Sequence, residues 1–111
     1  MNVYDCANEL AKALRESREF TVLKDEKTKL AGDKTSMDLV NDFLKLSQEI
    51  EILKYQKQAV PEEKTAQLNK LTGVLNLNPA AISYLNAFMR FNMMMQDVSK
   101  SITDVVKEVT D

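Results

Sequence analysis

Few side chains in this chain of 111 residues are suited to chemistry. It has no histidine and a single cysteine, Cys6. A lone thiol cannot form an intramolecular disulfide, and without histidine it leaves almost no soft ligands for zinc or an iron–sulfur cluster. We therefore expect neither a metal nor a cofactor. Cys6 flanks an apolar stripe, which is typical of a small, partly buried hydrophobic residue.

The adjacent carboxylates of Glu62 and Glu63 come nearest to an acid–base pair. Neighbouring side chains on a helix point about 100° apart, and acids that follow a proline already suit the positive first turn of a helix. The stretch 24–29 interleaves lysines with Asp25 and Glu26, so it forms a mixed charged face. There is no glycine-rich phosphate loop and no nucleophile elbow. The sequence predicts that the protein is not an enzyme.

The overall composition is typical of a folded helical protein, with 44% hydrophobic and 29% charged residues. The net charge of -2 lacks the basic excess that phosphate contacts require, so we expect no direct binding to nucleic acid. The chain has no run of about 18 apolar residues, which a membrane-spanning helix would need. Its first residues lack the features of a secretory signal. We expect a single cytoplasmic domain covering residues 1–111.

Four helix breakers, Gly32, Pro61, Gly73 and Pro79, divide the chain into helical blocks. Strict apolar–polar alternation is missing, which argues against β-strands. The first block covers residues 2–31, with Asn2 as its cap and Gly32 in a left-handed conformation at its end.

An apolar stripe with 4-3-4 spacing runs along the start of this block: Val3, Ala7, Leu10 and Leu14. Ser17 offers a second cap, after which Phe20, Leu23, Lys27 and Leu30 continue with a shifted phase. The shift indicates either one kinked helix or two helices.

The second block is expected to begin at Thr35 or Ser36 and to end near Ala59. In the third block Pro61 should occupy the first helical position, and Gly73 is a candidate end. The last block enters through Asn78 and Pro79 and then meets no further breaker. These blocks predict an all-α bundle of four to five helices, two of them long, that associates through the long C-terminal helix.

The last block carries an unbroken heptad pattern, which we call the main seam. A helix with such a seam lays one stripe along another helix. The main seam consists of Tyr84, Phe88, Phe91, Met95, Val98, Ile102, Val105 and Val109. A second stripe, set well away from it, consists of Ile82, Leu85, Met89 and Met93.

A small monomer offers limited cover for both stripes, and Arg90 is the only charge between Pro79 and Gln96. We therefore predict a homodimer, or a tetramer of dimers, in which one stripe crosses between subunits. The predicted interface residues are Tyr84, Phe88, Met89, Phe91, Met93, Met95, Val98 and Ile102. An alternative is a module that encloses an apolar ligand near Phe88, Met89 and Met93.

Two stretches of the chain resemble the YlbF/YmcA family of small bacterial helical proteins. The first has a Leu-x-x-x-Leu core followed by an "ES-x-EF" junction, here Leu10, Leu14, Glu16-Ser17 and Glu19-Phe20. The second, "NPAAISYLNAFMRFNMMMQDVSKSI", is similar to the long closing helix of the family, with its Asn-Pro entry. Among subgroups, the chain looks closest to the YheA-like one.

The resemblance implies an all-helical, oligomeric, cytoplasmic bacterial protein. Better-known relatives act as accessory factors in regulatory complexes linked to RNA processing, competence, biofilm formation and sporulation. Some of them hold iron–sulfur clusters through cysteines, a pattern from which this chain departs because Cys6 stands alone. The resemblance therefore favours an oligomeric adaptor, with other regulatory proteins as its partners, in an RNA-processing or developmental complex.

Overall fold

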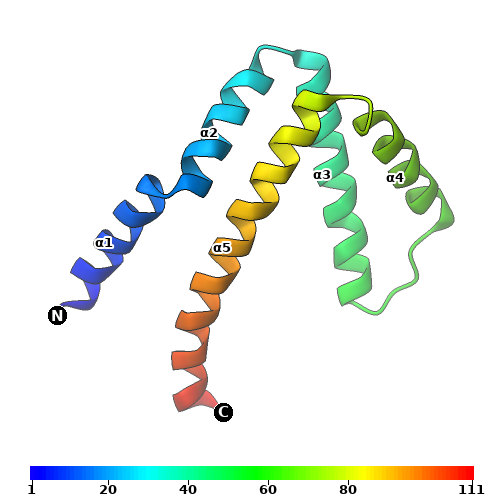
Figure 1. Ribbon diagram of the computed structural model, residues 1–111. Coiled ribbons are helices and arrows are strands. Elements are labelled where there is room, and N and C mark those ends of the chain that lie inside the picture. The colour runs from blue at the N-terminus through cyan, green and yellow to red at the C-terminus, as the bar shows by residue number, and fades with distance from the viewer.

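The computed structural model describes residues 1–111, of which 86% lie in helices and none in a strand. The five helices are α1 (Val3–Glu16), α2 (Arg18–Ala31), α3 (Lys34–Tyr55), α4 (Glu62–Leu75) and α5 (Pro79–Thr110). The predicted all-α architecture with two long helices, α3 and α5, is confirmed (Figure 1).

The first block consists of two helices that meet at Ser17. The Ser17 backbone is extended, with φ -68° and ψ 152°. Its hydroxyl donates a hydrogen bond to the Leu14 carbonyl at 2.6 Å and accepts one from the Phe20 amide at 3.2 Å. One residue therefore ends α1 and caps α2, which fixes the direction of the chain between them.

Two other predicted caps are also present. The Asn2 side chain accepts a hydrogen bond from the Tyr4 amide at 2.8 Å, and the Asn78 side chain accepts one from the Ala81 amide at 3.1 Å. Pro79 is the first residue of α5, as expected.

The predicted start of the second block at Thr35 or Ser36 is wrong. Asp33 is the N-cap of α3, and its carboxylate accepts a hydrogen bond from the Ser36 amide at 3.2 Å.

The left-handed conformation predicted for Gly32 is also wrong, since its φ is -75°. Its amide donates to the Lys29 carbonyl at 3.3 Å. This tight last turn leads directly into the next cap, so no left-handed residue is needed.

Helix α3 ends at Tyr55, earlier than the predicted Ala59. The left-handed residue that ends it is Lys57, with φ 58°. The Lys57 amide bonds to the Lys54 carbonyl at 3.0 Å, and the Gln58 amide bonds to the Leu53 carbonyl at 2.9 Å. This pair of bonds is the Schellman motif, which usually places glycine where Lys57 lies.

Helix α4 also differs slightly from its prediction. Pro61 lies at the N-cap position, one residue before the first helical residue. The helix continues through Gly73 to Leu75, which is only 2% exposed. Burial of Leu75 in the core offsets the weak helix propensity of Gly73.

The main core lies where four helices meet, at the upper end of the view in Figure 1. Its buried residues are Leu30, Val40, Leu75, Ala81 and Leu85.

A polar link joins the starts of α3 and α5 beside this core. The Asn78 amide donates to the Ser36 hydroxyl at 2.7 Å, and that hydroxyl donates to the Asp33 carboxylate at 2.7 Å. Ser36 is 1% exposed, so this satisfied link fixes the relative position of the two helices.

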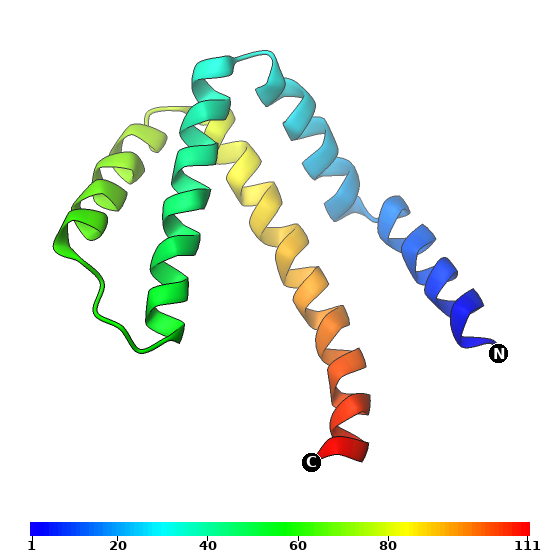
Figure 2. The ribbon, with the colours of Figure 1, turned by 180° about the vertical axis from the view of Figure 1, so that it is seen from behind.

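Away from this core the molecule is open. Only 9 of 111 residues are buried, and the accessible surface is 8787 Å². A compact monomer of 12.6 kDa would expose about 6,200 Å², roughly 2,600 Å² less. The radius of gyration is 17.6 Å, against about 13 Å for a compact chain of this length. Both views show α1 and the second half of α5 extending away from the core (Figures 1 and 2).

The Schellman motif at Lys57 generates a prediction about stability. A left-handed conformation costs a residue with a Cβ about 1–2 kcal/mol. We expect Lys57→Gly to raise the free energy of unfolding by about 1 kcal/mol, measured by urea denaturation followed by circular dichroism. Gln56→Gly is the matched control, because Gln56 has φ -80° and should gain nothing. Equal effects of the two substitutions would refute the assignment of Lys57 as the left-handed residue that ends α3.

Candidate association surfaces on the last helix

The first half of the main seam is covered by α2 of the same chain. The rings of Phe20 and Phe91 lie 6.2 Å apart at an interplanar angle of 55°, and those of Tyr84 and Phe88 stack at 6.1 Å. Tyr84, Phe88, Phe91 and Met95 are half-buried. This part of the seam therefore contributes to the fold of the single chain.

The second half of the main seam has no such cover. We call Val98, Ile102, Val105 and Val109 the tail seam. Val98 is half-buried, but Ile102, Val105 and Val109 are 58%, 61% and 85% exposed. Helix α1 contacts only α2, so it does not shield this stripe. The tail seam is the first uncovered apolar surface of α5.

The second stripe is divided in a similar way. Leu85 is buried and Ile82 half-buried, and both pack in the core with α3. Met89 and Met93, one and two turns further along α5, are 60% and 64% exposed. They line a groove of about 440 Å³ that runs between α5, α3 and α4.

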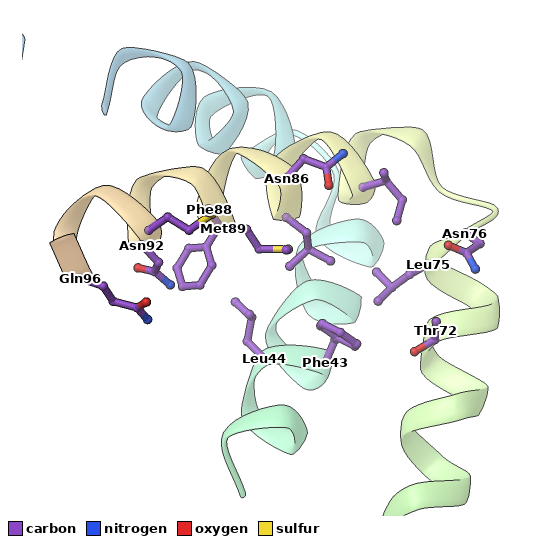
Figure 3. Close-up of a pocket in the computed structure, with 13 residues that line it drawn as sticks. Phe43, Leu44, Thr72, Leu75, Asn76, Asn86, Phe88, Met89, Asn92 and Gln96 are labelled. Carbon is purple, nitrogen blue, oxygen red and sulfur yellow. The ribbon is translucent and has the colours of Figure 1, made fainter. Parts of the chain in front are cut away.

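The groove is apolar inside and neutral at its rim. Figure 3 shows Phe88 and Met89 of α5 on the side that faces Phe43 and Leu44 of α3, with Leu75 of α4 at one end. No charged side chain lines it, and its polar groups are a hydroxyl and four amides: Thr72, Asn76, Asn86, Asn92 and Gln96. This lining suits an uncharged apolar partner.

The eight predicted interface residues therefore separate into two sets. Met89, Met93 and Ile102 are exposed, whereas the other five are half-buried. Phe91 packs on Phe20. Their role in an interface stays a prediction. The sequence interpretation missed the contribution of α3 and α4 to the groove, because helical periodicity assigns residues to faces but does not say which helices diverge.

The titratable groups with displaced pKa values have structural partners. Hydrogen bonds from the Ser36 hydroxyl and amide lower the pKa of Asp33. A hydrogen bond and ion pair with Lys64, 2.9 Å away, lower the pKa of Glu49 and join α3 to α4. No group of three or more cysteine, aspartate and glutamate side chains is arranged to hold a metal ion. Neither Asp33 nor Glu49 lines the groove.

None of the five helices combines the length and the apolar character that crossing a lipid bilayer requires.

The helical fold and the two uncovered surfaces of α5 define a small all-α protein with apolar surfaces left open. Residues 3–107 match the family described as "Control of competence regulator ComK, YlbF/YmcA", and the chain belongs to this family. The predicted resemblance to the family is thereby confirmed, while the closeness to the YheA-like subgroup stays a prediction.

Relatives agree with this assignment, and two solved structures share the fold. A "UPF0342 protein" of Caldicellulosiruptor saccharolyticus is 38% identical over 105 residues, covering 95% of this chain and 88% of the relative. A protein of unknown function (DUF964) from Bacillus stearothermophilus shares the fold, with a TM-score of 0.74, 15% identity and coverage of 96% and 94%. Bacillus subtilis RicA, solved in complex with RicF, has a TM-score of 0.59 at 18% identity, with coverage of 98% and 96%.

The different surroundings of Phe91 and Met89 generate a second prediction. Phe91→Asp places a charge against Phe20 and should lower the free energy of unfolding by about 2–4 kcal/mol. Met89→Asp is the matched control, because its largely exposed side chain can keep the new carboxylate in water. Urea denaturation of both variants checks this. A larger loss for Met89→Asp would contradict the assignment of faces.

Proposed function

We propose that the protein is a non-catalytic interaction protein that assembles with itself, as a homodimer or a tetramer of dimers. In this proposal it acts as an adaptor in a regulatory complex, with RNA-processing or developmental complexes as the candidates. The observation that carries the proposal is the apolar surface left open along α5 and α1. Exposed apolar patches of this extent are uncommon in soluble monomers and mark interaction surfaces.

The areas involved support assembly. A standard interface buries about 800 Å² on each partner. The surface exposed beyond that of a compact monomer, roughly 2,600 Å² of polar and apolar surface together, is about three times as large. One interface with a second copy therefore leaves room for another protein, as an adaptor requires.

The family supports the regulatory part of the proposal. Its description concerns control of a competence regulator, and the structural neighbour RicA was solved in complex with RicF. That complex belongs to RicA, and by analogy we propose a protein partner for this chain. The net charge of -2 gives no support to direct nucleic-acid binding. We place the protein in the cytoplasm as one domain over residues 1–111, with no membrane partner and no cofactor.

The groove between α3, α4 and α5 favours a second candidate function, the binding of a small apolar ligand. Its volume of about 440 Å³ lies within the range of about 300–1,000 Å³ typical of ligand sites. Phe88, Met89 and Met93 would contact the ligand, and the amides of Asn86, Asn92 and Gln96 would bind its polar end.

Native mass spectrometry of the recombinant protein separates the two candidates. Self-assembly predicts a mass of two or four chains at micromolar concentration, because the apolar surfaces are covered only in the oligomer. Ligand binding predicts one chain plus a small additional mass. A bare monomer at all accessible concentrations would reject self-assembly.

Affinity capture from the native cell tests the adaptor role. We expect a defined protein to co-purify with the tagged chain and to be lost from a variant with Met89→Asp and Met93→Asp. Thr103→Asp is the matched control, since Thr103 is exposed on α5 and does not line the groove. Recovery of the chain alone, with a tag at either end, would contradict the adaptor proposal.

A further inference from the structure

Helices α2 and α5 pack antiparallel with a fixed register. In such a pair, the sequence positions of two residues that face each other always add to the same sum, which we call the constant of the pair. Phe20 and Phe91, whose rings are in contact, set this constant at 111. Leu23 with Phe88, and Lys27 with Tyr84, obey the same rule and line one common cavity. Leu30 and Ala81 obey it inside the core.

The same rule matches α1 to the uncovered tail seam of α5. The α1 stripe has spacing 4-3-4, and the tail seam read backwards has spacing 4-3-4 as well. With a constant of 112 every residue of one stripe faces a residue of the other. The pairs are Val3 with Val109, Ala7 with Val105, Leu10 with Ile102, and Leu14 with Val98. The sum differs by one from that of α2 and α5 because the α1 stripe is offset by one residue from the continuation of the α2 stripe across Ser17.

The residues beside the two stripes also fit. In heptad terms each a position of one stripe faces a d position of the other, as antiparallel packing requires. The flanking positions carry small or apolar side chains, such as Ala11 and Ala13 on α1 and Ser99 and Ser101 on α5. All five charged residues of α1 point away from the stripe, and Glu108 is the one charge that flanks the tail seam. The two helices can therefore approach closely with little charge to desolvate.

Within one chain the two stripes do not meet. Helix α1 contacts α2 alone, and the hydrogen bonds of Ser17 on both sides hold the bend between them. Val3 and Leu10 are consequently 80% and 37% exposed, and no residue of α1 is buried. Figures 1 and 2 both show α1 running apart from the end of α5.

We propose that α1 of a second copy packs antiparallel on the tail seam, and that the exchange is reciprocal. A second copy is the occupant because each chain presents both complementary stripes and cannot join its own. A two-fold symmetric dimer then forms both contacts at once. This inference rests on the proposed self-assembly and specifies its surface.

Disulfide trapping between two separately purified variants tests the exchange. Both carry Cys6→Ser; one adds Leu10→Cys and the other Ile102→Cys. After mixing and mild oxidation we expect a covalent heterodimer. Lys12→Cys, on the opposite side of α1, replaces Leu10→Cys in the matched control and should give none. Neither target side chain belongs to the core, since Leu10 is 37% and Ile102 58% exposed, so the substitutions leave the core intact.

The other outcomes are each decisive. A third variant carries both Leu10→Cys and Ile102→Cys in one chain. If its disulfide forms only within single chains, α1 closes on its own α5 and the exchange is overturned. No linkage while native mass spectrometry still records a dimer would overturn the exchange and leave the proposed self-assembly standing. No linkage with a bare monomer would overturn both.

A second variant guards against a cysteine pair of poor geometry. Leu10→Asp should raise the dimer dissociation constant at least about tenfold without changing the helical content. Lys12→Asp is the control and should change the constant less than about twofold. Equal dissociation constants for the two variants would overturn the proposal.

Discussion

The structure depends on a mismatch of length between α5 and the helices that cover it. Helix α5 has 32 residues and spans about 48 Å, whereas α2 has 14 residues and spans about 21 Å. A helix can bury an apolar seam only where another helix lies beside it. Because α2 begins only after Ser17, the seam is covered as far as Phe91 and uncovered from Ile102 onward. The open shape and the surfaces available for assembly follow from this mismatch.

The polar link beside the core determines where these surfaces lie. Asp33, Ser36 and Asn78 join the starts of α3 and α5 at one end of the molecule. From that point the two helices diverge (Figure 1), and the groove lies between them. A hydrogen-bonded link whose central residue, Ser36, is buried is rigid, so Met89 and Met93 are presented on a fixed scaffold.

Much of the fold could be predicted from the sequence because its signals are local. Asn2, Ser17 and Asn78 cap helices as expected, and the two stripes of α5 were assigned to separate faces. The errors concern competition between neighbouring signals. Asp33 precedes Ser36 and is the better-placed cap, and Lys57 adopts the left-handed conformation where the sequence has no glycine to mark it.

The candidate surfaces were less predictable, for a physical reason. Periodicity shows that Phe91 and Met89 lie on different faces, but it cannot show that α2 covers Phe91 while α3 diverges from Met89. That difference depends on helix directions, which are set by single residues such as Ser17 and Asn78. The pairing of α1 with the tail seam becomes visible only after the contact between Phe20 and Phe91 has fixed the register of α2 against α5.

The central claim is that the stripes on α1 and on the end of α5 are covered by another chain. Hydrogen exchange measured by mass spectrometry, over a range of protein concentrations, tests it most directly. Helices in the folded core should be protected at every concentration. The account predicts that amides of residues 3–16 and 98–110 are protected at high concentration and lose protection together on dilution. Rapid exchange of both segments at the highest concentration, with α2 and the start of α5 still protected, would contradict it.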